Sequence, residues 1–168
     1  RQMCIRDRFP IAADGLSVVV KKGGAAETCV NSMGGLTPDQ VRWIYSDFTA
    51  AQLAAAGWDT NSLANSDNDD STHLWSELDA SCPASEIKIS GADSESGTYE
   101  FFMDAMLSDA GNGETFDLNR PDGYTNSAED EVVVNYLESN ADSIGYFGYA
   151  YYKHNQDNLT AIAIENSD

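Results

Sequence analysis

The stretch from Gly91 to Ser96 and the residues after it have the types and spacing that could bind an anion. The stretch is small and polar, which is typical of a tight loop. It follows a short alternating run, Glu86 to Ser90, that predicts a β-strand, and it precedes Thr98 to Leu107, whose apolar spacing predicts a helix. The first turn of a helix has unpaired N–H groups, and the aligned peptide dipoles place roughly half a positive charge there. The stretch is therefore a candidate site for an oxyanion such as phosphate.

Three residues at this junction provide hydrogen-bond donors for an anion. Ser96 and Thr98 have hydroxyl groups, and Gly97 lets the backbone approach a ligand with no side chain in between. A purely structural interpretation is equally open, in which Ser96 only caps the helix and Gly97 relieves a turn. These residues alone leave both interpretations standing.

Catalytic and metal sites have weaker support in the sequence. A serine hydrolase would pair Ser96 with His73 or His154, the only two histidines, but the chain has no G-x-S-x-G motif. Neither histidine belongs to a Cys/His cluster with zinc spacing, and the acidic run at 65–70 lacks the Gly and Glu of an EF-hand loop. We expect a non-enzymatic protein with no metal and no cofactor.

The overall charge excludes one class of partner. The chain of 168 residues has 9 basic and 28 acidic residues and a formal net charge of −19. Nucleic-acid binding requires clustered Lys and Arg, so we expect no nucleic-acid partner, and a polyanion of this kind favours a soluble monomer. The negative charge does not exclude anion binding, because exposed charges are screened over about 8 Å at physiological salt. No run of 18 apolar residues is present.

Further patterns predict the elements around the candidate site. Thr37 as N-cap, Pro38 at the first helical position and Gln40 three residues after the cap predict the start of a helix. We also expect Ser127 to cap a helix with Asp130 at its third position. The remaining expectations are strands at Leu16–Lys21, Asp142–Tyr149 and Thr160–Ile164, a short helix ending near Asn155, and a loop at Asp117–Asn126.

The anion motif resembles a known segment. It is similar to the phosphate-binding segment of the periplasmic phosphate-binding proteins of ABC uptake systems, the PstS type, in the run Ser96-Gly97-Thr98-Tyr99-Glu100-Phe101-Phe102. The resemblance continues, in order, through residues 34–37, 42–45, 74–78 and 143–152, and it runs from about Ile11 to the end of the chain.

The resemblance implies a fold and a division of the chain. The fold class is α/β, an incomplete three-layer lobe of the periplasmic-binding-protein type (type II) with a central mixed sheet flanked by helices. The implied division is a non-native leader at 1–8, an inter-lobe crossing strand at 9–24, the second lobe at 25–159, and the start of a truncated return crossing at 160–168. The family's proteins have two lobes hinged around the ligand.

The resemblance also implies a function. A protein of this type captures inorganic phosphate between its lobes and delivers it to an ABC transporter permease, and it is periplasmic or extracellular and associated with the cell envelope. A binder of another oxyanion (molybdate, tungstate or sulfate) is the first alternative, and a serine hydrolase that uses Ser96 is the second. Because one lobe leaves the anion open to water, we expect phosphate binding by this chain alone to be on the order of millimolar or weaker.

Specific residues are implied as ligands. The backbone N–H groups of Gly97 and Thr98 and the hydroxyls of Ser96 and Thr98 would donate hydrogen bonds to phosphate. Glu95, or Asp93 in its place, would accept the proton of hydrogen phosphate, which sulfate lacks. Arg120 is a possible counter-charge, although a solvent-exposed arginine that neutralises nearby carboxylates explains it equally well.

The cysteines are interpreted in the same context. An exported binding protein sits in oxidising surroundings, so we predict a disulfide between Cys29 and Cys82. Two unpaired thiols are the alternative. Cys4 lies in the leader and should remain unpaired.

Overall fold

The computed structural model describes residues 15–46, 48–63, 72–107 and 124–165. Its first half contains one strand, four α-helices and a 3-10 turn, which are β1 (Leu16–Lys21), α1 (Ala25–Met33), α2 (Pro38–Tyr45), α3 (Ala50–Ala55), η1 (Asn61–Leu63) and α4 (Trp75–Leu78). Strands and helices alternate in its second half, which contains β2 (Lys88–Ala92), α5 (Gly97–Leu107), β3 (Tyr124–Ser127), α6 (Asp130–Ser139), β4 (Ser143–Gly148), α7 (Tyr149–Asn155) and β5 (Leu159–Ala161).

The five strands form one mixed sheet in the order β3-β2-β4-β1-β5. Strand β2 pairs in parallel with both β3 and β4, whereas β1 is antiparallel to β4 and to β5. The register places Leu16, at the start of β1, opposite Gly148, at the end of β4. The carboxyl ends of β2 and β4 and the amino end of β1 therefore lie at one edge of the sheet.

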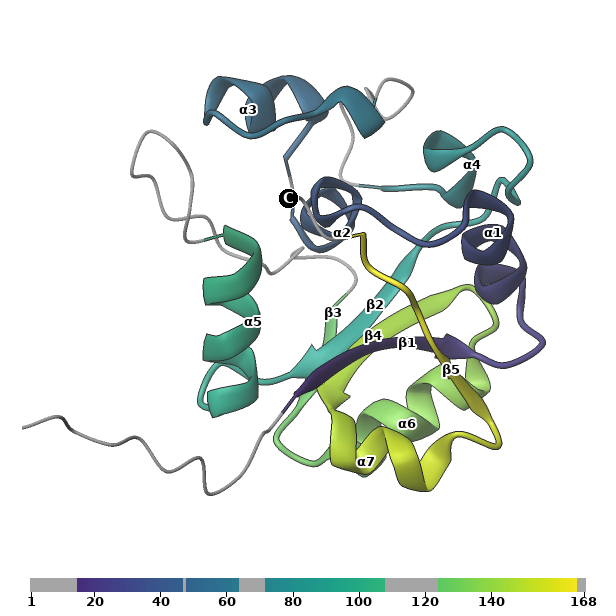
Figure 1. Cartoon of the computed structure of the whole chain (residues 1–168). Helices are drawn as coiled ribbons and strands as arrows, with labels where there is room; N and C mark the ends of the chain where they lie inside the picture. Colours follow the sequence, from purple (N-terminus) through teal and green to yellow (C-terminus); the bar gives the residue numbers. More distant parts are fainter. Residues whose placement is uncertain (1–14, 47, 64–71, 108–123, 166–168) are drawn as a thin grey trace, which may run out of the picture.

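Helices cover both faces of the sheet, which gives three layers (Figure 1). On β1, Val18 and Val20 pack with the residues of α1, α2 and α5, whereas Val19 packs with α6 on the other face. Alternate residues of a strand point to opposite faces, so this run of valines contributes to both cores. The predicted α/β class, with a mixed sheet between helical layers, is confirmed.

Helix α2 begins as its sequence predicts. Thr37 Oγ1 accepts a hydrogen bond from the Gln40 amide at 3.1 Å, and Gln40 Oε1 accepts one from the Thr37 amide at 3.0 Å. Pro38 occupies the first turn. Trp43, on the buried side of this helix, is fully enclosed in the core.

Two local expectations were wrong. Tyr124 to Ser127 forms edge strand β3, because its backbone groups pair with those of β2, so the loop expected up to Asn126 ends earlier. Ser127 does not cap α6. Its hydroxyl accepts from the Glu129 amide at 3.0 Å in the preceding turn, and Glu129 takes the N-cap position without a side-chain bond.

The last strand is shorter than expected and joins this sheet. It covers Leu159 to Ala161 and pairs with β1, after which Ile164 forms an isolated bridge with Leu36. Strand β1 itself lies in the interior of the sheet, between β4 and β5. The assignment of 9–24 and 160–168 to crossings between lobes stays a prediction, as does the leader at 1–8, which lies outside the described residues.

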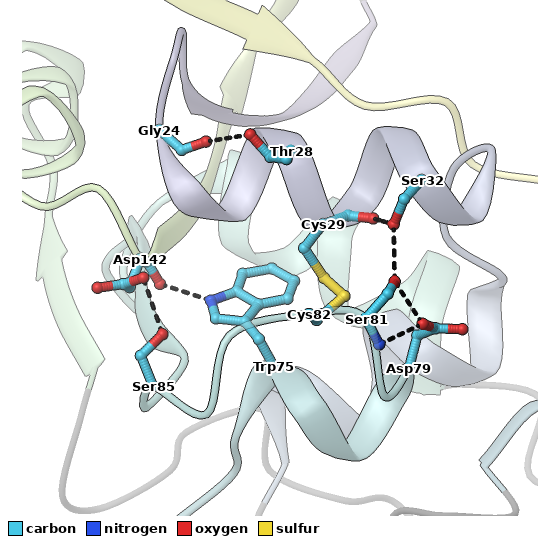
Figure 2. The surroundings of a disulfide bond; sticks show 10 residues. All are labelled: Gly24, Thr28, Cys29, Ser32, Trp75, Asp79, Ser81, Cys82, Ser85 and Asp142. Atoms are coloured by element: carbon cyan, nitrogen blue, oxygen red, sulfur yellow. Dashed lines mark hydrogen bonds between the residues drawn. A yellow bond between two sulfur atoms is a disulfide. The ribbon is translucent and has the colours of Figure 1, made fainter.

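The predicted disulfide between Cys29 and Cys82 is present. It joins α1 to the segment that follows α4, and Figure 2 shows it beside the indole of Trp75. Trp75 Nε1 donates to the Asp142 carbonyl at 2.9 Å, and the Ser85 hydroxyl donates to the Asp142 carboxylate at 2.8 Å. These contacts attach the segment before β2 to the turn before β4. Cys4 lies outside the described residues.

Candidate oxyanion-binding site

The turn between β2 and α5 is closed by hydrogen bonds from its own backbone. Asp93 Oδ1 accepts from the Glu95 amide at 3.1 Å, and the Asp93 carbonyl accepts from the Ser96 amide at 3.1 Å. The Asp93 amide donates in turn to the Ser127 carbonyl at 3.3 Å, which attaches the turn to the end of β3. The amides of Asp93, Glu95 and Ser96 are therefore engaged within the chain.

The start of α5 leaves one amide available. Ser96 Oγ accepts from the Thr98 amide at 3.1 Å, and the Ser96 carbonyl accepts from the Glu100 amide at 3.2 Å, so Ser96 does cap this helix. In the part of the chain that the structure describes, the Gly97 amide makes no such bond. Gly97 is also exposed. Both the Gly97 and Thr98 amides were expected to donate to an anion, and the structure instead engages the Thr98 amide with Ser96.

Gly97 and Thr98 line a pocket of about 240 Å³ at the edge of the sheet where β2 and β4 end. The other lining residues come from the start of β1, the next turn of α5 and the end of β4, namely Gly15, Leu16, Phe101 and Gly148. A Cβ added at Gly97 or at Gly148 would meet nothing within 4 Å, so both backbones face open space.

The position of this pocket in the topology explains why it exists. The helix after β2, α5, packs on one face of the sheet through Phe102 and Met106, whereas the helix after β4, α7, packs on the other through Tyr151 and Tyr152. Neighbouring parallel strands whose helices diverge leave a crevice outside their carboxyl ends, and ligands bind in such crevices in open α/β sheets. The pocket between Gly97 and Gly148 is that crevice.

The expected site residues are only partly brought together. Ser96 is half-buried next to the lining residues, but Glu95 is exposed and does not line the pocket. Asp93 is half-buried and closes the turn. Arg120 lies outside the described residues. None of the lysines and arginines within residues 15–46, 48–63, 72–107 and 124–165 lines the pocket, so the described residues offer an anion there N–H and O–H groups and no formal positive charge.

Comparisons with known proteins agree with the resemblance seen in the sequence. The chain is 29% identical to the protein SphX of Synechococcus elongatus over 160 residues, which are 95% of this chain and 37% of that protein. It is 26% identical over 160 residues to the phosphate-binding protein PstS of Staphylococcus saprophyticus, covering 95% of this chain and 38% of that protein. No protein-family model matches the chain.

Nearly the whole chain is therefore similar in sequence to PstS and SphX. Its fold matches a crystal structure of a possible phosphate-binding protein from Planctomyces limnophilus, with a TM-score of 0.64 at 24% identity over 92% of this chain and 43% of that one. The chain thus spans between a third and a half of the length of these PstS-like proteins, as expected for a partial lobe.

Four residues that line the pocket were not predicted as site residues from the sequence: Gly15, Leu16, Phe101 and Gly148. Phe101, which belongs to the motif run, is 59% exposed and lines the pocket. One pattern in the sequence could have indicated Gly148. It stands between a buried strand and a helix, and the turn that leads to Gly97 also lies between a strand and a helix.

The histidines do not form a catalytic pair with Ser96. Among the described residues, the Ser96 hydroxyl is hydrogen-bonded to the Thr98 amide and to neither histidine. His73 is buried and its ring is stacked on Trp43 with centroids 3.8 Å apart, and His154 is exposed at the end of α7. The described part of the chain also contains no cluster of His, Cys, Asp and Glu that could hold a metal ion.

Proposed function

We propose that this chain forms one wall of the phosphate-binding cleft of an ABC importer's solute-binding protein. In this role the protein captures inorganic phosphate between two lobes and delivers it to the permease. The observation that carries the proposal is the available Gly97 amide at the start of α5, which lines the crevice between β2 and β4. The names of the homologues, phosphate-binding protein PstS among them, support phosphate as the anion.

Three donors at this helix start can act on one anion. Gly97 N–H donates directly, with the positive end of the dipole of α5 behind it. The Ser96 hydroxyl uses one lone pair to accept from the Thr98 amide, which leaves its own O–H free to donate to phosphate. The Thr98 hydroxyl is the third donor. The cap and the ligand site are therefore compatible.

Discrimination between oxyanions requires an acceptor. Hydrogen phosphate has a proton to donate and sulfate does not, so an acceptor in the closed cleft would be left unpaired by sulfate. An unpaired buried acceptor costs about 1–3 kcal/mol, which corresponds to about 5- to 150-fold in affinity. Glu95 and Asp93 are the acceptors we propose from this lobe, and the exposed Glu95 would need the other lobe to cover it. Arg120 remains our proposed counter-charge.

The proposal also covers the location and the oligomeric state of the protein. We expect an exported, non-enzymatic monomer that works in the periplasm or at the outer face of the cell envelope. The Cys29–Cys82 disulfide supports this, because disulfides persist in oxidising compartments. No helix in the described residues is long and apolar enough to cross a membrane.

The proposal is tested by equilibrium dialysis of the chain against radiolabelled phosphate, with unlabelled sulfate and molybdate as competitors. We expect phosphate binding on the order of millimolar, because a single lobe leaves the hydrogen bonds in water. The variant Gly97→Pro should lose this binding yet remain folded, since proline is tolerated in the first turn of a helix but has no N–H.

Glu131→Gln, an exposed change on α6, is the control and should bind as the parent chain does. Equal binding by Gly97→Pro would contradict the proposed site. Stronger competition by molybdate or sulfate than by unlabelled phosphate would favour the other oxyanions, and submicromolar affinity of the single chain would contradict the two-lobe account.

A further inference from the structure

The hydroxyls of the buried Tyr146 and the half-buried Tyr124 meet beneath the turn that precedes the candidate site. The hydroxyl oxygens of Tyr124, on β3, and Tyr146, on β4, are 2.8 Å apart. Tyr124 donates to the carbonyl of Ala92, the last residue of β2, and Tyr146 Oη lies 3.5 Å from the same carbonyl. Both short contacts are satisfied when Tyr146 donates to Tyr124 and Tyr124 donates to Ala92. The end of β2 is thus tied to both neighbouring strands by side chains as well as by the sheet.

The ring of Tyr146 also sets the spacing between β2 and α5. It is stacked on Phe102 of α5, with centroids 3.9 Å apart and planes at 14°. It lies so close to Gly91 of β2 that a Cβ on that residue would come within 2.2 Å of a ring carbon. Phe102 is one helical turn beyond Thr98, so this ring separates the strand from the helix on either side of the turn.

The surroundings of these hydroxyls hold them in place. Tyr45 packs edge-on against both Phe102 and Tyr146 and donates from its own hydroxyl to the Ser90 carbonyl at 3.3 Å. Burial raises the pKa of Tyr124 and of Tyr146 above the ordinary tyrosine value, so both hydroxyls keep their protons at neutral pH. Hydrogen bonds of largely buried groups are costly to leave unmade.

We propose that Tyr124 and Tyr146 are positioning residues for the anion site: their hydroxyl pair fixes the Ala92 carbonyl, and the Tyr146 ring fixes α5, so that Gly97 is held at the pocket. The consequence for ligand binding rests on the proposed function. The positioning itself does not, because it concerns the turn from Ala92 to Gly97 whether or not an anion is bound.

The test compares Tyr146→Phe and Tyr124→Phe, which keep the rings and remove one hydroxyl each. Tyr136→Phe, a half-buried tyrosine on α6, is the matched control. Two quantities are measured on each chain: amide hydrogen exchange residue by residue, and the affinity for inorganic phosphate. We expect both hydroxyl variants to speed exchange at Glu95, Ser96 and Thr98, whose amides are hydrogen-bonded, and to weaken phosphate binding, each by about 2- to 10-fold. Exchange at Val19 and Ile144 in the core should not change.

The possible results separate the two claims. Parent-like exchange in the turn and parent-like affinity in both variants would overturn the positioning role while leaving the phosphate site intact. Faster exchange that extends equally to Val19 and Ile144 would also overturn it, because the hydroxyls would then serve only global stability. If the parent chain binds no phosphate but exchange rises only in the turn, the proposed function falls and the positioning role stands. If Tyr146→Phe does not fold, the same measurements on Tyr124→Phe decide the result.

Discussion

The hydroxyl oxygen of Ser96 lies 3.1 Å from the amide nitrogen of Thr98 and accepts its proton. The structural interpretation of Ser96 as a helix cap is therefore correct, and it does not compete with the ligand interpretation. A hydroxyl that accepts one hydrogen bond still has a proton to donate. The pair also explains why Gly97, between them, is the position at which the backbone is open to a ligand.

Replacing Ser96 by Asp should separate capping from binding. Aspartate is as good an N-cap as serine and suits the positive end of a helix, so the free energy of unfolding should stay within about 1 kcal/mol of the parent value. Phosphate binding should be lost, because the carboxylate repels the anion and has no proton to donate. Urea unfolding and equilibrium dialysis measure the two effects. Ser96→Asn, which caps without charge, is the control, and phosphate binding by Ser96→Asp would show that Ser96 does not contact the ligand.

Gly91 should tolerate no side chain, in contrast to Gly97. In Gly91→Ala the new methyl group would meet the ring of Tyr146, so we expect a loss of about 1–3 kcal/mol in the free energy of unfolding. Gly97→Ala is the matched control, because its Cβ meets nothing within 4 Å and alanine favours the helix by about 0.5–1 kcal/mol. Thermal and urea unfolding of the two variants test this. Equal stability of both would mean that Tyr146 does not fix the strand as closely as the structure indicates.

The Cys29–Cys82 disulfide should contribute much of the stability of this single lobe. The two cysteines are separated by 53 positions in the sequence, and closing a loop of this length stabilises the folded state by up to about 4 kcal/mol in the entropy model. Reduction, or the double change Cys29→Ala and Cys82→Ala, should lower the urea midpoint accordingly. A Cys4→Ser chain should keep the parent midpoint. An unchanged midpoint after confirmed reduction would mean that the packing of Trp75 alone holds α1 to this segment.

Glu27 should contribute to the loss of stability as the pH falls into the acid range. Hydrogen bonds from the Thr160 hydroxyl and from the Gly23 amide hold the pKa of Glu27 below its ordinary value. A carboxylate with a depressed folded-state pKa stabilises the fold above its unfolded-state pKa, and this contribution is lost as the pH falls through the folded-state value. Glu27→Gln should therefore be less stable than the parent chain at pH 7, and the difference should shrink as the pH approaches 3. Glu131→Gln is the exposed control, and a difference that grows toward low pH would contradict the assignment.

The sequence predicted those parts of the fold that local residue types determine. The Thr37 capping box, the valine-rich strand β1 and the strand, turn and helix around Gly97 all follow from short-range patterns. Edge strand β3 was missed because Tyr124 to Ser127 has no apolar alternation, and its structure depends on pairing with β2. The disulfide was predicted only through the family resemblance, since spacing alone does not bring Cys29 to Cys82.

The site was predicted in part for the same reason. The donors at Ser96 and Gly97 lie close together in the sequence, so a motif could reveal them. The facing wall, Gly148 with Leu16, is formed by the antiparallel pairing of β1 and β4, which no local pattern specifies. The hydrogen bond from the Thr98 amide to Ser96 could not be predicted from the sequence, because a serine that caps a helix and a serine that binds a ligand occur in the same sequence pattern.

The central claim is that the amide of Gly97 binds the anion, and the most direct measurement is its resonance in two-dimensional ¹H–¹⁵N spectra during a phosphate titration at constant pH and ionic strength. We expect the Gly97 amide proton to move downfield and to saturate with a dissociation constant on the order of millimolar, while the amides of Val19 and Leu137 in the opposite core layer stay in place. A Gly97 resonance that does not move, or that moves no more than those two, would contradict the account.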